Sequence, residues 1–252
     1  MYRVAVSLAL LAGCSFRTNI FATASDGPVA DDDAPADGPG DAPIDARSDA
    51  PPDSPPPPPF CDPNDPTLVA CYELENTTND ASANSLNATS TGVTYVTGKI
   101  GNAAHVTAGT DMHVAENPAL DVSALTIECW IRATVPTTGR AGIVDNEGQW
   151  GFFLQPNGAL QGVGLTSQAN IQADTWTHVA LTYDGTTRHY VNGVEVASAG
   201  NTSGSFSTTN GSSGISIAAD NPSGSPLLGD IDQLRIFSVA RTPQQIAADA
   251  TP

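Results

Sequence analysis

The sequence predicts an all-β domain of antiparallel strands, with one short helix at its C-terminal end. The first supporting observation is the stretch Trp176–Val196, which begins with alternating apolar and polar residues up to Tyr183. That period of two is typical of a half-buried strand. Asp184-Gly185 and Asn192-Gly193 then supply tight turns, because these residue types tolerate positive φ. Three short antiparallel strands in succession form a meander, which is the building unit of a sandwich.

The second observation is the composition of the 252-residue chain, which contains 23 Gly, 20 Pro, 40% hydrophobic residues and only 14% charged residues. Such a chain suits one all-β domain accompanied by a disordered segment. The formal net charge is −18, from 27 acidic and 9 basic side chains. Phosphate backbones and anionic lipid headgroups are repelled by this charge, which argues against nucleic acid as a partner. A cation, a neutral glycan or a basic protein is favoured instead.

The N-terminus has the pattern of an export signal. A short basic start precedes the apolar run Val4–Ala12, which is too short to span a bilayer and fits the core of a signal peptide. The run ends in Leu11-Ala12-Gly13-Cys14, which resembles the lipobox of bacterial lipoproteins. This resemblance implies that residues 1–14 hold the signal and that Cys14 is acylated, and Ser15 after it favours the outer membrane or cell surface. The alternative is cleavage after Ala22-Thr23-Ala24, which would release a secreted or periplasmic protein.

Residues 15–59 are expected to form a disordered, acidic linker. From Asp26 to Pro59 the chain is almost entirely Asp, Ala, Pro, Gly and Ser. These residues bury too little apolar surface to offset the entropy lost on ordering. The linker is therefore predicted to act as a stalk or spacer in front of a folded domain over residues 60–252.

Cysteine positions suggest one disulfide. Cys61 and Cys71 flank a turn-rich loop, and an exported chain occupies an oxidising compartment, so a Cys61–Cys71 disulfide is expected. Cys129 is then a buried free thiol. A Cys71–Cys129 pair is the alternative. The chain has no Cys-x-x-Cys pair or His/Cys cluster of the kind that holds zinc.

The same alternation and turn residues predict the remaining elements. Strands are expected over Leu68–Leu74, near Ala104, and over Met112–Val114, Leu125–Arg132, Gly142–Val144, Trp150–Leu154, Ala159–Leu165, Arg188–Val191, Val194–Val196, Gly214–Ala218 and Asp230–Phe237. In Leu125–Arg132, the odd-numbered residues form one apolar face. Thr242 followed by Pro243 and then Gln245 predicts a capped helix start.

Taken together, residues 68–249 resemble a laminin-G-like domain of the concanavalin A-like lectin/glucanase superfamily. The segments that carry the resemblance are Leu68–Tyr72, Asp80–Asn84, Gly98–Ala103, Leu125–Ile131, Trp176–Val196, Gly229–Phe237 and the terminal helix. The resemblance implies a two-sheet antiparallel jelly-roll sandwich. It leaves function open, because this fold hosts lectins, adhesins, enzymes and spacer domains.

Catalysis is not expected. Glycosidases of the superfamily that this chain resembles carry a Glu-x-Asp-x-x-Glu strand, which places carboxylates on one face as acid and nucleophile. The nearest match is Glu73-Leu74-Glu75, which lacks the third carboxylate and lies in the first strand. His178 and His189 accompany no recognisable Ser or Cys nucleophile.

A structural calcium ion is expected from the resemblance, since domains of this superfamily often hold one at a sheet edge. The candidate ligands are Glu75, Asp80, Asp111 and Asp232. Calcium requires several oxygen ligands, and the acidic domain supplies them. The alternative is that Asp232 pairs with an arginine or caps a loop.

The expected ligand-binding residues are Trp150, Asp145 and Asn146, at the tip of a predicted hairpin. Trp150 could stack on a sugar ring, whereas Trp130 and Trp176 match scaffold positions and are assigned to packing. The function expected is a surface-anchored, non-catalytic module that binds a glycan or an extracellular protein, with contact to the membrane through the lipid anchor only. The alternatives are a spacer domain without a small ligand and, more remotely, a glycoside hydrolase.

Overall fold

The computed structural model describes residues 59–208, 213–220 and 224–251. The predicted anchor at Cys14, the alternative cleavage site and the linker up to Pro58 lie outside these residues. Within them, no helix is long and apolar enough to cross a membrane.

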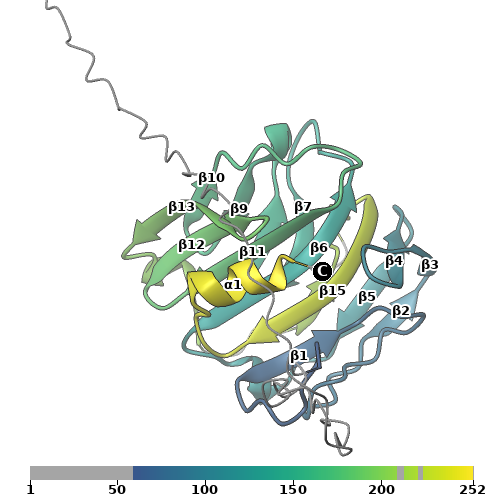
Figure 1. Cartoon of the computed structure of the whole chain (residues 1–252), viewed down its shortest axis with the longest axis horizontal. Coiled ribbons are helices and arrows are strands. Elements are labelled where there is room, and N and C mark those ends of the chain that lie inside the picture. Colours follow the sequence, from purple (N-terminus) through teal and green to yellow (C-terminus); the bar gives the residue numbers. More distant parts are fainter. Residues whose placement is uncertain (1–58, 209–212, 221–223, 252) are drawn as a thin grey trace, which may run out of the picture. The chain divides into compact units, whose positions relative to one another are not determined.

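Two antiparallel sheets face each other across the core (Figure 1). Sheet A contains, in spatial order, β13 (Val194–Gly200), β12 (Thr186–Val191), β11 (Thr177–Tyr183), β6 (Leu125–Ala133), β15 (Gly229–Phe237), β4 (Asn102–Val106) and β3 (Thr94–Thr97), with β1 (Leu68–Tyr72) also paired to β15. Sheet B contains β10 (Leu165–Ser167), β9 (Leu160–Gly162), β8 (Trp150–Leu154), β7 (Ala141–Asn146), β14 (Ile215–Ile217), β5 (Asp111–Val114) and β2 (Thr89–Thr91). The predicted two-sheet sandwich is confirmed.

Within the described part of the chain, four helical segments accompany the sheets. Three are short 3-10 turns, at Pro118–Leu120, Pro156–Gly158 and Ser203–Ser205, and the fourth is the terminal helix α1 (Pro243–Asp249). The predicted capping arrangement is present, because Thr242 Oγ1 accepts from the Gln245 N–H and the Gln245 side chain accepts from the Thr242 N–H.

Strand β15 occupies the middle of sheet A. One edge pairs with β6 over most of its length, while the other edge is shared between β4 at Gly229–Ile231 and β1 nearer Phe237. A bulge interrupts the pairing with β6 between Asp232 and Arg235, and Gln233 adopts a positive φ of 54° there. Three earlier strands therefore depend on one late segment of the chain.

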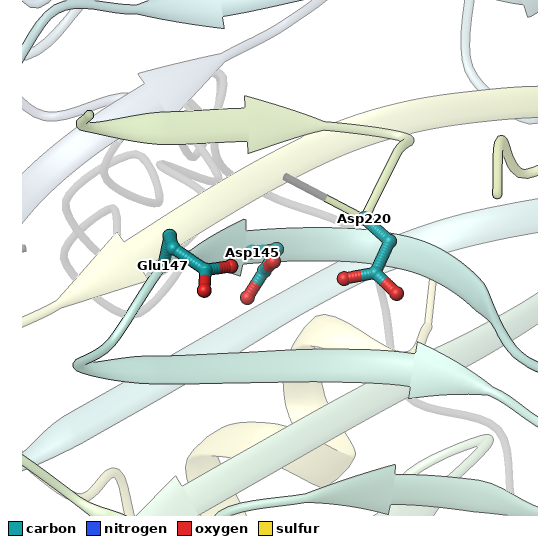
Figure 2. Close-up of side chains that lie close together, drawn as sticks. All are labelled: Asp145, Glu147 and Asp220. Carbon is teal, nitrogen blue, oxygen red and sulfur yellow. The ribbon is translucent and has the colours of Figure 1, made fainter. Parts of the chain in front are cut away.

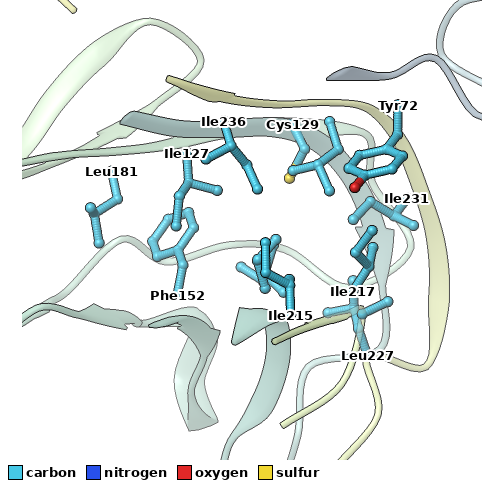
Figure 3. Close-up of a cluster of buried hydrophobic side chains, with 14 of the residues drawn as sticks. Tyr72, Ile127, Cys129, Phe152, Leu181, Ile215, Ile217, Leu227, Ile231 and Ile236 are labelled. Carbon is cyan, nitrogen blue, oxygen red and sulfur yellow. The ribbon is translucent and has the colours of Figure 1, made fainter. Parts of the chain in front are cut away.

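The core lies between the sheets and is built from the alternation predicted for β6. Leu125, Ile127, Cys129 and Ile131 all point inward, and Figure 3 shows side chains of sheet A meeting Phe152 and others from sheet B. Cys129 is a buried free thiol, and burial raises its pKa. The expected Cys61–Cys71 disulfide is present, which excludes the Cys71–Cys129 alternative.

The outer face of sheet A is also largely covered. Helix α1 lies across it (Figure 1) and buries Ile246 against Ala180 and Tyr190. Under the helix, Glu128 is 1% exposed and its Oε1 lies 2.8 Å from Arg235 Nη2. Alternation alone would leave the Glu128 face of β6 in water, but the helix and the side chains around it cover that face.

The observed strands differ from the predicted ones in two places, and each difference has a local cause. Ala159–Leu165 is predicted as one strand, but it divides into β9 and β10 because Val163 and Gly164 both turn with positive φ. Strands β2 and β3 are missed by the alternation criterion, since they are Thr-rich and partly or fully exposed.

Candidate functional site

The predicted ligand-binding residues lie at the tip of the β7–β8 hairpin, on the rim of sheet B. Glu147-Gly148-Gln149 turns the chain, with Gly148 at a φ of 80° and the Gln149 N–H donating to the Asn146 carbonyl at 2.9 Å. Beside this turn lies a cavity of about 330 Å³, which we call the hairpin pocket. It is lined by Arg140, Asp145, Asn146, Glu147, Gly148, Gln149, Trp150, Phe153 and residues 204–207.

Three carboxylates gather at the hairpin pocket. Asp145 on β7, Glu147 in the turn and Asp220 after β14 place oxygens within 4.8 Å of one another (Figure 2). Asp220 reaches this position because Gly142 lets the chain pass close to β7, where a Cβ would lie 2.0 Å from the Ala219 carbonyl carbon. Asp145 is among the residues predicted from the sequence, whereas Asp220 is not, because it lies far from Asp145 along the chain.

Arg140 neutralises part of this acidic cluster. Its Nε and Nη2 donate to Asp220 Oδ2 and Oδ1 at 2.7 and 2.8 Å, and its guanidinium carbon lies 3.8 Å from the centre of the Phe153 ring. The hydrogen bonds to Asp220, followed by the nearby carboxylate charges, raise the pKa of Arg140 although burial opposes this. Both Asp220 oxygens therefore accept a hydrogen bond from Arg140, which would compete with a calcium ion for this carboxylate.

The predicted stacking role of Trp150 is wrong. Its side chain is 3% exposed, belongs to the main core cluster, and its Nε1 donates to the Leu120 carbonyl at 3.4 Å. The alternating face of β8 directs this indole inward, so it forms part of the pocket wall rather than a free platform. The flat surface offered to solvent is instead the Arg140 guanidinium stacked on Phe153.

Asn146 lines the same pocket and is fully buried. Its Nδ2 donates to Gln149 Oε1, and Gln149 Nε2 in turn donates to Asp121 Oδ1. Asn146 Oδ1 has no hydrogen-bond partner among the described residues. This row of amides connects the pocket to the loop before β6, and the role of Asn146 in ligand binding stays a prediction.

The four predicted calcium ligands separate into two near neighbours and two remote residues. Asp232 Oδ2 accepts from the N–H groups of Lys99 and Ile100 at 2.8 and 3.0 Å, and Glu75 Oε2 accepts from the Asn102 N–H at 2.9 Å. Both carboxylates therefore accept hydrogen bonds from backbone N–H groups at the turn between β3 and β4. Burial, together with the charge of Glu75, raises the pKa of Asp232 to about 6 despite those hydrogen bonds.

Asp80 and Asp111 do not join that pair. Asp80 lies in a closed network, where Oδ1 accepts from the Cys71 and Ser82 N–H groups and Oδ2 accepts from Ser82 Oγ and the Leu86 N–H. Asp111 begins β5 in sheet B, opposite Thr91 in register. Asp80 organises the loop after β1, which accounts for its position without a metal.

The histidines singled out in the sequence are structural. His178 and His189 lie on neighbouring strands of sheet A, and burial lowers the pKa of each to about 4. His178 forms an edge contact with Trp130, and His189 Nδ1 lies 3.1 Å from Ser167 Oγ. At neutral pH both rings are uncharged parts of the scaffold.

Residues 101–247, more than half of the chain, match the concanavalin A-like lectin/glucanases superfamily. The chain belongs to this superfamily. None of the curated proteins compared with it matches.

Solved structures share the fold of this concanavalin A-like domain. Domain 4 of AbnA, a GH43 extracellular arabinanase from Geobacillus stearothermophilus solved with arabinotriose, is 24% identical with a TM-score of 0.62, covering 73% of this chain and 98% of that one. The binding domain of Paraclostridial Mosquitocidal Protein 1 is 18% identical with a TM-score of 0.58, over 73% and 52%. A structure of botulinum neurotoxin type C, whose cell entry depends on two ganglioside molecules, is 15% identical with a TM-score of 0.53, over 73% and 50%. This chain thus spans about half the length of the two toxin chains.

Proposed function

We propose that this concanavalin A-like domain is a non-catalytic carbohydrate-binding module whose ligand lies in the hairpin pocket. The observation that supports this most directly is the Arg140 guanidinium, held flat by Asp220 and Phe153 at the mouth of a cavity of about 330 Å³. A planar, immobilised donor group beside carboxylate and amide acceptors suits sugar hydroxyls, which both donate and accept. Similar domains bind arabinotriose or belong to toxins that engage gangliosides.

The arrangement of the acidic groups next to the first strand supports a non-catalytic function. Glu73 is exposed, while Glu75 accepts hydrogen bonds from Asn102 and supports the turn before β4. In the hairpin pocket, Asp220 is committed to Arg140. Asp145 and Glu147 are the remaining carboxylates of that pocket. The pair Glu73 and Glu75 just after the first strand therefore lacks the free acid and nucleophile that glycoside hydrolysis requires.

Replacing Arg140 by methionine is expected to weaken glycan binding at least tenfold, because the substitution removes the stacked donor and frees Asp220. The measurement is a glycan array that includes arabino-oligosaccharides and ganglioside oligosaccharides, followed by calorimetry on the best ligand. Arg188→Met is the matched control, since Arg188 pairs with Asp184 at 3.1 Å on a different turn. If the array shows no bound glycan, with calcium or with EDTA, the domain is a spacer and the proposal fails.

We further propose that a calcium ion binds between Asp232 and Glu75. The donor set fits, because Asp232 is fully buried and its Oδ1 has no hydrogen-bond partner among the described residues. Glu75 lies close enough to raise the pKa of Asp232, so two carboxylates share this turn. A bound cation would stabilise both ionised groups and fix the turn against β15.

Calcium is expected to raise the melting temperature of the domain by several degrees, since a ligand at 100 times its Kd stabilises the native state by about 2.7 kcal/mol. Melting curves in millimolar calcium and in EDTA measure this shift. Asp232→Asn should abolish it, whereas Asp111→Asn, which alters a carboxylate in sheet B, should leave it intact. Identical curves with and without calcium in the unaltered protein would contradict the site.

The proposed cellular setting rests on the N-terminal sequence. An acylated Cys14 would tether the domain to the outer membrane or cell surface through the acidic, proline-rich linker. Mass spectrometry of the mature N-terminus tests this, because an unmodified chain that begins at Ser25 would rule out the anchor.

A further inference from the structure

A second constellation of polar groups lies on the outer face of sheet A, away from the hairpin pocket. His105 on β4, Asp230 on β15 and Arg132 on β6 are direct cross-strand neighbours, since Asp230 is in register with both of the others. We call these three residues the outer-face triad. They come from strands far apart in the sequence and are brought together by the central position of β15.

Asp230 fixes the orientation of both partners. Its side chain is 8% exposed, Oδ1 lies 2.7 Å from His105 Nδ1, and Oδ2 accepts from Arg132 Nε at 2.7 Å. The Arg132 guanidinium also lies over the Trp176 ring, 4.9 Å from its centre. A buried carboxylate and an aromatic face thus hold two polar groups side by side before any ligand arrives.

These contacts leave defined hydrogen-bonding capacity unused. A carboxylate can only accept, so His105 Nδ1 carries the proton in this contact, which leaves Nε2 for a ligand. The terminal nitrogens of Arg132 have no hydrogen-bond partner among the described residues, and they remain donors. The His105 and Arg132 side chains are 40% and 35% exposed, so both groups are accessible.

The triad opens onto a surface cavity of about 620 Å³. Leu228, which is 42% exposed, and Asp174 lie on its wall together with His105, Arg132 and Asp230. The cavity therefore combines an apolar patch with an adjacent donor, an adjacent acceptor and a further carboxylate.

The chemistry of this cavity selects a neutral polyhydroxyl ligand. A sugar hydroxyl can accept from Arg132 and donate to His105 Nε2 at the same time, and a C–H face of the ring can cover Leu228. An anion would instead meet the Nε2 lone pair, the Asp174 carboxylate and a chain of net charge −18.

We propose that the outer-face triad is a second carbohydrate site, specific for neutral sugars and independent of the hairpin pocket. Arg132 donates to the sugar, His105 accepts from it, Asp230 positions both, and Leu228 packs against the ring. The domain then offers one glycan surface on each of its two sheets.

The test is an amide NMR titration of the full chain carrying Cys14→Ser, with methyl glycosides of glucose, galactose, mannose and arabinose, with arabinotriose, and with the methyl glycoside of glucuronic acid. The Gly229 amide reports on the outer-face triad, and the Gly148 and Gly204 amides report on the hairpin pocket. We expect at least one neutral sugar to shift Gly229. Arg132→Lys keeps the charge but loses the planar fork of donors. This variant and His105→Gln should each lower the affinity read from the Gly229 titration at least tenfold.

The proposals for the outer-face triad and for the hairpin pocket can be tested separately. Arg140→Met should leave the Gly229 titration unchanged, so loss of the Gly148 and Gly204 shifts alone concerns only the hairpin pocket. The outer-face proposal is overturned if no neutral sugar moves Gly229, if Arg132→Lys and His105→Gln leave its affinity unchanged, or if glucuronate binds there more tightly than the neutral sugars.

Discussion

Replacing Arg235 by methionine is expected to lower the free energy of unfolding by about 3–5 kcal/mol at pH 8, the usual cost of removing one partner from a buried ion pair. Arg235 Nη2 lies 2.8 Å from Glu128 Oε1 and 2.9 Å from Asp249 Oδ2, and its Nη1 donates to the Phe60 carbonyl at 3.2 Å. One guanidinium therefore connects the centre of sheet A, helix α1 and the N-terminal segment of the domain.

Chemical denaturation at pH 8 measures the loss, with Arg188→Met as the control. Arg188 also forms an ion pair, but it is 31% exposed and its partner Asp184 is 48% exposed, so a change of no more than about 1 kcal/mol is expected. At pH 5 the loss in Arg235→Met should be smaller, because Glu128 can then take up a proton. Equal losses in the two variants would show that Arg235 has no special structural role.

The stability of the domain is also expected to depend strongly on pH, because the buried side chains of Glu128 and His189 act in opposite directions. Burial raises the pKa of Glu128 to about 7, so its contribution to stability is greatest below about pH 4.5 and is lost as the pH rises through 7. Burial lowers the pKa of His189 to about 4, so its contribution is present above about pH 6.5 and is lost as the pH falls through 4. Each shift corresponds to about 3 kcal/mol.

Single substitutions should separate the contributions of Glu128 and His189 to the pH dependence of stability. Relative to the unaltered protein, Glu128→Gln should gain stability as the pH rises from 4.5 to 8, and His189→Leu should gain stability as the pH falls from 7 to 4.5. Urea denaturation at a series of pH values provides the comparison. Parallel curves of stability against pH for all three proteins would mean that folding changes the pKa of neither group.

Much of the fold is predictable because its signals are local. The alternation in β6 and β11, the Asn192-Gly193 turn and the Thr242–Gln245 cap each act over a few residues. The disulfide also follows from a short separation of its cysteines and the expected compartment. These features require no knowledge of what lies across the sheet.

The sites are less predictable because their partners are remote. Asp145 and Asn146 line the hairpin pocket, and their role in ligand binding stays a prediction. Arg140 meets Asp220 across 80 residues and His105 meets Asp230 across 125. No periodicity in one segment reports which side chain will face it from another sheet strand. Trp150 is misassigned for the same reason, since a turn position does not tell which face of β8 its ring will take.

The place of β15 in sheet A has a consequence for the order in which the domain can assemble. As the polypeptide emerges from the ribosome, β1 appears first, yet its strand partner in the described structure is β15, the last strand to emerge. β4 and β6 also rely on that segment for one of their edges. The pairing of sheet A therefore cannot be completed until residues 229–237 have been synthesised, and non-local pairing of this kind is expected to make folding slow.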